Sequence, residues 1–248
     1  MPLFIYIAIF AFGAVVGSFL NVCIYRMPRG ESIISPPSHC PSCGDKIHSY
    51  DNIPIISYLI LKGRCRSCNQ AISPVYPTVE LLNGICYVII ASIFRPAEAV
   101  IYCIFISALI VITFIDLKHW IIPDRITLPG IAVGLVTAST ILPVGFKSSI
   151  IGAVLGGTLF YLIAVFSGGM GGGDVKLITM IGAFLGWKGM LITIFVGSLI
   201  GAVVGISLMI FKGFGRKSPI PFGPFLSLGA IIALFFSDRI VRLYLHLV

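Results

Sequence analysis

Eight apolar runs of membrane-spanning length constrain the fold of this chain more than any other feature of its sequence. A bilayer core about 30 Å thick requires about 20 apolar residues of helix. Only 10% of the 248 residues are charged and 58% are hydrophobic, whereas a soluble domain carries about 25% charged residues. The sequence therefore predicts an all-α polytopic membrane helix bundle with about eight transmembrane helices. The runs lie near residues 4–24, 78–94, 98–116, 125–142, 148–167, 175–186, 189–211 and 222–237. The sixth is short enough to be re-entrant or continuous with the seventh.

The charge distribution predicts how these runs are threaded through the membrane. The first run lacks a basic region before it and is too long for a signal-peptide core, so we expect it to be retained as a span. The chain divides into a first transmembrane helix (1–25), a polar four-cysteine loop (26–77) and a transmembrane core (78–248). If the loop is cytoplasmic, eight spans leave five basic residues outside and the other twelve of the 17 Lys and Arg inside. This bias matches the positive-inside rule and predicts a non-cytoplasmic N-terminus.

The net charge of +8 is explained by this topology. No basic stripe with interleaved aromatic residues is present, so we expect no nucleic-acid partner. The expected surroundings are the lipid bilayer. Glycines recur at four-residue spacing, which allows close packing of membrane helices. These are Gly13 and Gly17, Gly152 and Gly156, Gly182 and Gly186, and Gly197, Gly201 and Gly205.

Two C-x-x-C pairs lie in the polar loop. The first is Cys40 and Cys43, the second is Cys65 and Cys68, and 21 residues separate them. This spacing is close to that of a zinc ribbon, in which each knuckle supplies two thiolates to one tetrahedral ion. A cytoplasmic loop is reducing, so disulfides are disfavoured. We therefore predict a structural four-thiolate zinc site, with a redox dithiol as the alternative. We do not count His39 and His48 as ligands, and we expect Cys23, Cys86 and Cys103 in the core.

Two aspartates stand at the edges of apolar runs. Asp116 ends one run, and Asp174 follows a glycine cluster at 168–173 and opens another. Carboxylates are costly in a membrane segment, and the predicted topology puts both on the cytoplasmic side. In the structural interpretation each aspartate merely caps a helix end in water. In the functional one the two share a site, where like-charge repulsion leaves one proton shared between them. The charged partner then activates water while the protonated one polarises a peptide carbonyl, as in aspartic proteases.

The neighbours of the aspartates have simpler expected roles. Pro123 separates the third run from the fourth, and we expect Asp124 to be the N-cap of the fourth. The glycines before Asp174, including Gly171 and Gly173, allow close approach of the backbone to a substrate. Lys176 either acts on Asp174 or extends to lipid headgroups.

These motifs together resemble the type IV prepilin peptidases, the bifunctional leader peptidase/N-methyltransferases. The Gly171–Asp174 segment is similar to the G-x-G-D signature of intramembrane aspartyl proteases. The resemblance covers nearly the whole chain. It is carried by residues 17–26, 36–43, 50–54, 63–68, 76–82, 116–124, 169–177 and 221–226.

The resemblance implies a concrete activity. Such enzymes cleave the basic leader of prepilins and pseudopilins at the cytoplasmic face of the bacterial inner membrane. They then methylate the new N-terminal residue with S-adenosylmethionine, in support of type IV pili or type II secretion. It implies that Asp116 and Asp174 are catalytic, and that Gly63 and Glu80 belong to the methyltransferase half. A turn glycine and an interfacial glutamate explain the last two nearly as well.

The chain departs from the family at one position. Many relatives carry a second aspartate two residues after the first, where this chain has Lys118. Two alternatives remain open at this stage. One is an aspartyl peptidase of the same chemistry without methyltransferase activity. The other is a proton- or ion-coupled transporter or scaffold with a structural zinc loop. Against it, transporters place such groups at the bilayer midplane within inverted repeats, and no such repeat is evident.

Overall fold

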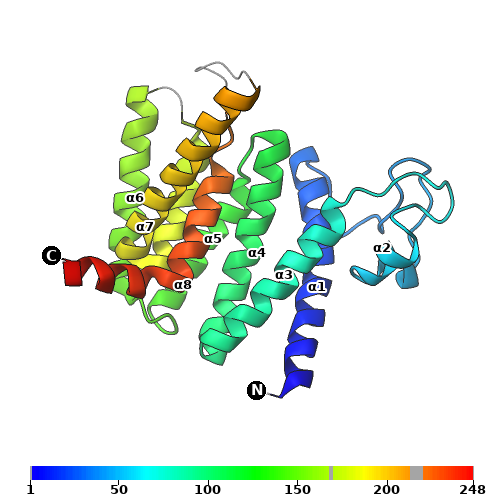
Figure 1. The fold of residues 1–248 in the computed structure, drawn as a ribbon, viewed down its shortest axis with the longest axis horizontal. Helices are drawn as coiled ribbons and strands as arrows, with labels where there is room; N and C mark the ends of the chain where they lie inside the picture. The colour runs from blue at the N-terminus through cyan, green and yellow to red at the C-terminus, as the bar shows by residue number, and fades with distance from the viewer. Residues whose placement is uncertain (1, 168–169, 213–219, 248) are drawn as a thin grey trace. The chain divides into compact units, whose positions relative to one another are not determined.

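A computed structural model describes residues 2–167, 170–212 and 220–247 (Figure 1). The chain divides into two compact units, Met1–Val111 and Ile112–Val248, and each is described here by itself. The described residues form helices and no named strand. The helices are α1 (Leu3–Arg26), η1 (Met27–Arg29), η2 (Ser49–Asn52), α2 (Ile56–Ile60), α3 (Val75–Ile93), α4 (Pro96–His119), α5 (Asp124–Ala138), α6 (Phe146–Ser167), α7 (Gly172–Lys212) and α8 (Gly223–Leu247).

The predicted class, an all-α membrane helix bundle, is confirmed. Within the described residues, five helices are long and apolar enough to cross a membrane, and α8 contributes a shorter apolar helix at Gly223–Ser237. The sixth and seventh predicted runs form one helix, α7, which is interrupted at Gly186. There φ is 66° and ψ is −176°, a backbone conformation that glycine adopts without steric cost. The expected N-cap at Asp124 is wrong, because Asp124 is already helical and Pro123 occupies the N-cap position.

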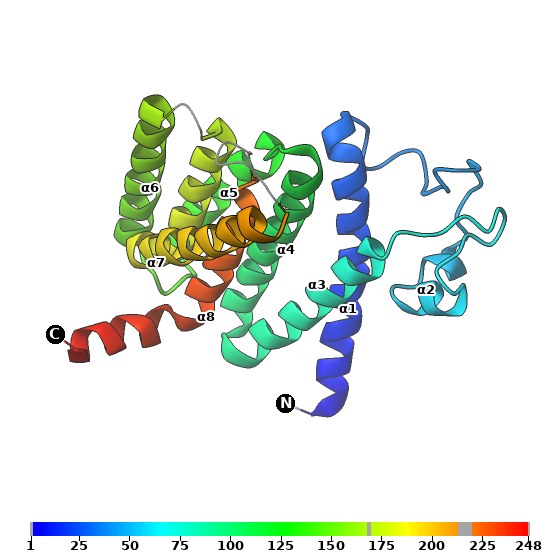
Figure 2. The ribbon, with the colours of Figure 1, turned by 45° about the horizontal axis from the view of Figure 1, so that its top comes forward.

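The first unit contains a closely packed antiparallel pair, α1 and α3, which run side by side in Figures 1 and 2. Small residues allow this approach, since a Cβ added at Gly13 would lie 2.9 Å from the Cα of Gly84. Each step of four residues forward along α1 is matched by a step of four residues back along α3. The two helices therefore run antiparallel and stay in contact over about two turns. The facing pairs are Gly13 with Gly84, Gly17 with Glu80, and Asn21 with Tyr76.

A buried polar network lies beside this pair. The Asn83 side chain donates to the Gly13 carbonyl at 2.7 Å and accepts from the Ser107 hydroxyl at 3.0 Å. The Tyr87 hydroxyl lies 3.0 Å from the same Ser107 oxygen. The network satisfies polar groups that would be costly if left unpaired away from water. Of the three cysteines expected in the core, Cys23 is buried and Cys86 and Cys103 are half-buried.

The second unit is held together by glycine contacts between α6, α7 and α8. The backbones of α6 and α7 meet where Gly152 faces Gly182, and Ser149 donates to the Ala183 carbonyl nearby. On α8, a Cβ added at Gly229 would lie 2.6 Å from the Thr193 carbonyl oxygen and 3.0 Å from the Gly197 nitrogen of α7. The four-residue glycine spacing in the sequence therefore marks real helix contacts, as predicted.

Candidate functional site

Asp116 lies in the last turn of α4 and is buried, with 5% of its surface exposed. The helix ends just beyond it, where Trp120 adopts a left-handed φ of 59° and donates its N–H to the Asp116 carbonyl at 3.0 Å. The carboxylate is oriented from a distant part of the chain. The backbone N–H of Gly223, at the start of α8, donates to Asp116 Oδ2 at 3.0 Å. One carboxylate oxygen is thus fixed by a backbone donor.

Asp174 lies in the first turn of α7, and its backbone N–H donates to the Gly171 carbonyl at 3.1 Å. Its Oδ1 is buried and has no hydrogen-bond partner among the described residues. Such a buried oxygen is costly unless water, a substrate or a proton satisfies it. Of the glycine cluster in front of it, residues 168 and 169 lie outside the described residues. The free oxygen distinguishes Asp174 from Asp116.

The structure brings the two aspartates together within the second unit. The Asp116 carboxyl lies close enough to act electrostatically on Asp174. Ile122, which is buried, connects their supporting segments. A Cβ added at Gly173 would lie 2.8 Å from Ile122 Cβ, and one added at Gly223 would lie 3.2 Å from Ile122 Cδ1. The end of α4, the start of α7 and the start of α8 therefore meet around one isoleucine.

Lys176 does not contact either aspartate of this pair among the described hydrogen bonds. Its Nζ lies 2.7 Å from both carboxylate oxygens of Asp124, at the start of α5. Both side chains are substantially exposed, so the ion pair contributes little to stability. Lys118 is exposed as well. The cation nearest to Asp174 in the sequence, Lys176, is therefore engaged with Asp124 and not with the pair.

Gly223 is the residue that sequence reasoning missed. It lies in the segment 221–226, which carried part of the family resemblance but had no assigned role. A Cβ added there would lie 2.6 Å from Asp116 Oδ2, so a side chain at this position displaces the carboxylate. A glycine between Pro221–Phe222 and Pro224 at a helix start is a visible signal, but its partner lies 107 residues away.

The four predicted cysteine ligands form a second candidate site, in the first unit. Cys40, Cys43, Cys65 and Cys68 place their sulfur atoms within 4.8 Å of one another, and Cys40 Sγ lies 3.8 Å from Cys68 Sγ. A tetrahedral ion with zinc–sulfur bonds of about 2.3 Å separates its sulfur ligands by about 3.8 Å. The number, chemistry and spacing of these donors fit a four-thiolate metal site.

The two cysteine pairs sit in equivalent turns. In each turn the backbone carbonyl of the first cysteine accepts the N–H of the residue four positions later. The backbone N–H of the same cysteine donates to the carbonyl of the residue five positions later. These contacts are Gly44 to Cys40, Cys40 to Asp45, Asn69 to Cys65, and Cys65 to Gln70. Gly44 and Asn69 both adopt positive φ, 74° and 58°, and asparagine tolerates this conformation better than most residues. The loop thus contains two copies of one turn, and together they could hold a metal ion.

Backbone donors also favour the thiolate form of Cys40, the first cysteine of the first turn. The Cys43 N–H, followed by that of Ser42, donates toward the Cys40 sulfur and lowers the Cys40 pKa to about 6. A thiolate is the form that binds metal. The two nearby histidines lie outside the cluster, as predicted. His39 Nδ1 lies 3.2 Å from the Pro37 carbonyl, and the His48 ring stacks on Tyr50.

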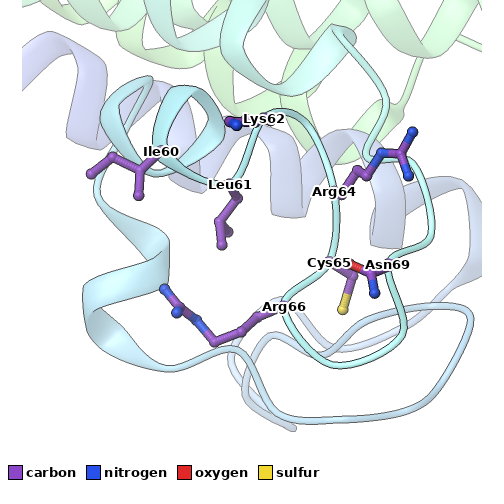
Figure 3. Close-up of a pocket in the computed structure, with 7 residues that line it drawn as sticks. All are labelled: Ile60, Leu61, Lys62, Arg64, Cys65, Arg66 and Asn69. Atoms are coloured by element: carbon purple, nitrogen blue, oxygen red, sulfur yellow. The ribbon is translucent and has the colours of Figure 1, made fainter.

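A shallow pocket of about 630 Å³ lies beside the second turn (Figure 3). Leu61 lies across it from Cys65 and Asn69. Three basic residues and no acidic one line it. The lining residues are Ile60, Leu61, Lys62, Arg64, Cys65, Arg66 and Asn69.

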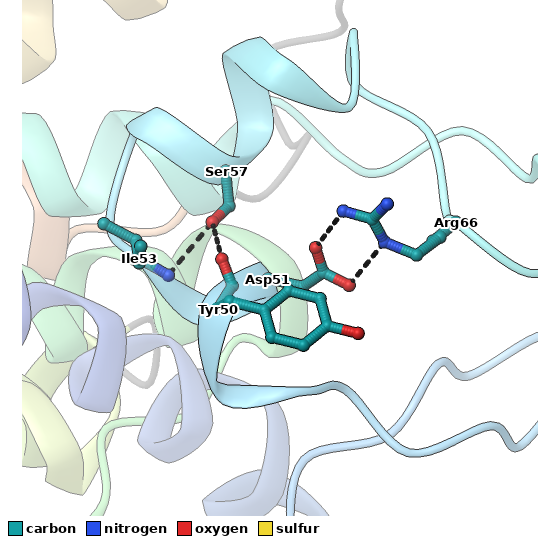
Figure 4. A network of polar contacts seen from close by, with 5 residues as sticks. All are labelled: Tyr50, Asp51, Ile53, Ser57 and Arg66. Atoms are coloured by element: carbon teal, nitrogen blue, oxygen red, sulfur yellow. Dashed lines mark hydrogen bonds and ion pairs between the residues drawn. The ribbon is translucent and has the colours of Figure 1, made fainter.

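A polar network braces the turns against the helical part of the loop (Figure 4). Arg66 donates twice to Asp51, at 2.8 and 2.6 Å, and this bond holds the Asp51 pKa below its ordinary value. The Ser57 hydroxyl donates to the Tyr50 carbonyl at 2.9 Å and accepts the Ile53 N–H at 3.0 Å. Ser67 of the second turn donates to Asp45 of the first. The four cysteines are therefore held by a connected scaffold.

Gly63 and Glu80, the two residues that the family resemblance assigns to the methyltransferase half, have structural contacts. Gly63 adopts φ of 68°, accepts from Ile72 and packs under Tyr58. Glu80 is buried on α3, and its Oε2 accepts the Ile55 N–H at 2.7 Å. Ile55 itself adopts a positive φ of 63°, which is strained for a β-branched residue. Glu80 therefore holds a strained loop segment against the helix pair.

Comparison with known proteins gives a consistent result for the whole chain. Residues 11–94 match the model of the bacterial peptidase A24 N-terminal domain, and residues 103–206 match that of the type IV leader peptidase family. A prepilin leader peptidase/N-methyltransferase of Aeromonas salmonicida is 35% identical over 99% of this chain and 95% of its own length. The Pseudomonas aeruginosa protein of that name is 34% identical with the same coverage. The Myxococcus xanthus protein is 40% identical over 86% of this chain and 65% of its own length. No solved structure matches the chain significantly.

Proposed function

The chain belongs to the type IV leader peptidase family, and from this premise we propose that Asp116 and Asp174 are the catalytic pair of a prepilin leader peptidase/N-methyltransferase. The observation that carries the proposal is that the end of α4, the start of α7 and the start of α8 pack around Ile122, which brings Asp116 and Asp174 near one another. Two acids in an apolar bundle are energetically costly, and such residues usually mark a functional site. A transporter would also use such acids, but none of the relatives reported above is named as a transporter.

The contacts of the pair assign different roles to its members. Asp116, held by the Gly223 N–H, is the base that takes a proton from water. The hydroxide oxygen bonds to the scissile carbonyl carbon while Asp174 gives its proton to the carbonyl oxygen. The free, buried Oδ1 of Asp174 suits this donor role. The tetrahedral species then collapses: its hydroxyl proton returns to Asp174, the C–N bond breaks, and the leaving amine takes the proton from Asp116. Both carboxyl groups end as they began.

The substrate chemistry agrees with this position. A prepilin has a basic leader followed by an apolar helix, so its scissile bond lies at the membrane surface. We place this chain in the bacterial inner membrane with a non-cytoplasmic N-terminus and the aspartate pair at the cytoplasmic face. The excess of basic residues in the loop at 26–77 supports this orientation. We retain the division into a first span (1–25), a cysteine loop (26–77) and a protease core (78–248) as part of the proposal.

The cysteine loop carries the proposed cofactor chemistry. Cys40, Cys43, Cys65 and Cys68 would hold a structural zinc ion, which cross-links the two turns and leaves no open coordination position. S-adenosylmethionine, when bound, supplies the methyl group that is transferred to the new terminal amine. Because Gly63 forms a turn and Glu80 is engaged by the Ile55 N–H, their contacts fit positioning of the loop and not direct contact with the methyl donor.

A cleavage assay with the purified full-length chain tests the proposal. The protein is incubated with a prepilin and S-adenosylmethionine, and the product is weighed by mass spectrometry. We expect loss of the leader and gain of one methyl group in wild type, and no cleavage in Asp116→Asn or Asp174→Asn. Glu98→Gln, in the first turn of α4 at the opposite end of that helix from Asp116, is the matched control and should cleave normally. Cleavage without methylation would leave a peptidase alone, and cleavage by both aspartate variants would refute the catalytic pair.

A further inference from the structure

An apolar patch lies outside the candidate membrane spans, on the short helix α2 and the loop segment directly before it. The exposed fractions are 53% for Ile56, 67% for Leu59 and 69% for Ile60, and Ile53 is 45% exposed. We call these four residues the α2 patch. Isolated exposed apolar residues are ordinary, but a contiguous group marks a surface that contacts something. The sequence places this patch inside an otherwise polar loop.

One hydrogen bond joins the segment before α2 to helix α3, which is long and apolar enough to span a membrane. The Ile55 N–H, directly before α2, donates to Glu80, which lies five residues after the start of α3 at Val75. Five residues of helix correspond to about 7.5 Å along its axis. The start of α2 therefore lies beside the first turns of a helix that is long and apolar enough to span the membrane, at the loop end of that helix. Apolar faces of interfacial helices are buried near this end of a span.

Basic side chains accompany the patch. Lys62 and Arg64 follow α2 directly, are exposed, and form no ion pair among the described residues. Arg66, by contrast, is paired with Asp51. Lys62 and Arg64 line the pocket shown in Figure 3, in which the described lining contains no carboxylate. The unpaired charge on this surface is thus positive and lies next to exposed apolar side chains, beside the loop end of a candidate span.

From this combination we propose that the α2 patch, Lys62 and Arg64 form a docking site for anionic phospholipid of the bilayer that holds the chain. Ile56, Leu59 and Ile60 enter the headgroup–acyl boundary, and Lys62 and Arg64 bind the lipid phosphates. The charge is complementary to an anionic leaflet, and the Ile55–Glu80 hydrogen bond joins the segment that carries the patch to a candidate span. Docking holds the cysteine centre at the membrane surface. The proposal depends on the membrane-spanning fold and not on the proposed catalytic roles.

Photo-crosslinking of the full chain in nanodiscs tests this site. Leu59 is replaced by the photoreactive residue benzoylphenylalanine, and the nanodiscs contain equal amounts of phosphatidylglycerol and phosphatidylcholine. We expect lipid adducts at position 59, identified by mass, with phosphatidylglycerol favoured. Each basic residue near an anionic surface is worth about fivefold in this preference, so Lys62→Gln with Arg64→Gln lowers it by up to about 30-fold.

Matched controls separate this proposal from its alternatives. Lys46→Gln removes an exposed cation from the first cysteine turn and should leave the lipid preference unchanged. Metal content of each variant reports whether the loop is folded, and millimolar inorganic phosphate should not abolish the preference. Absence of lipid adducts, a protein adduct in their place, equal labelling of the two lipids, or competition by free phosphate would each overturn the proposal.

Discussion

Replacement of Gly223 by alanine tests the assigned geometry of the aspartate pair most directly. The added Cβ would lie 2.6 Å from Asp116 Oδ2 and 3.2 Å from Asp116 Cγ. The backbone N–H that donates to the carboxylate is retained, so the substitution removes no donor. Gly223 does not adopt positive φ, so alanine adds no backbone strain. The perturbation is a displacement of one carboxylate.

The size of this displacement sets the expected effect. Ordinary contact between a Cβ and a neighbouring atom begins near 3.4 Å, so the Asp116 oxygen must move by about 0.8 Å. A misplacement of about 1 Å at a reacting group costs about 100-fold in rate, or about 2.7 kcal/mol of transition-state stabilisation. We expect kcat for leader cleavage to fall by about this factor. KM should change little, because the leader and apolar helix of the substrate bind outside the immediate pair.

Initial rates of prepilin cleavage over a range of substrate concentrations separate kcat from KM. Gly205→Ala is the matched control, since it adds the same methyl group to α7 at an ordinary contact distance of 3.6 Å from its nearest atom. Both variants must retain wild-type elution and metal content. A Gly223→Ala enzyme with kcat within twofold of wild type would refute the claim that this glycine positions Asp116.

Three further outcomes follow from the same contacts. Gly173→Ala should reduce the rate of cleavage, because its Cβ would lie 2.8 Å from Ile122 Cβ. Adding Ile122→Ala should restore part of that rate, which kinetic assays of the double variant measure. Asp124→Asn and Lys176→Met should each change the free energy of unfolding by less than about 1 kcal/mol, since their ion pair is exposed; a double-mutant cycle of denaturation measurements checks this. Cys65→Ser should abolish stoichiometric zinc binding, measured by metal analysis, and make the loop between residues 39 and 71 sensitive to protease; retained stoichiometric zinc would contradict the four-cysteine site.

Much of this architecture could be predicted because it depends on local spacing. The apolar runs predicted the helices, and two short cysteine motifs predicted a cluster that the structure brings within 4.8 Å. The two aspartates could be paired because both stand at run ends on one predicted side of the membrane. Each of these inferences needs only the period of a helix, the length of a span or the reach of a turn.

The missed features depend on contacts between distant parts of the chain or on turn geometry with a degenerate signal. Gly223 meets Asp116 across 107 residues, and Lys176 meets Asp124 across 52, so no local pattern announces either contact. Aspartate is a residue type that N-cap positions favour, yet Pro123 occupies the N-cap of α5 and Asp124 is its first helical residue. The repeat of the cysteine turn is not obvious in the sequence, because the left-handed position holds glycine in one copy and Asn69 in the other.

The diversion of Lys176 has a consequence for the chemistry of the pair. An ammonium within hydrogen-bond reach of Asp174 would favour two carboxylates at once, and the pair would then lack the proton that its acid member must donate. The structure instead engages that ammonium with Asp124 on both oxygens and orients Asp116 with a backbone N–H. An N–H dipole fixes a carboxylate with less than a full charge. The pair is therefore positioned by backbone and apolar contacts, which agrees with the proposed roles, in which one of the two carboxyl groups carries a proton.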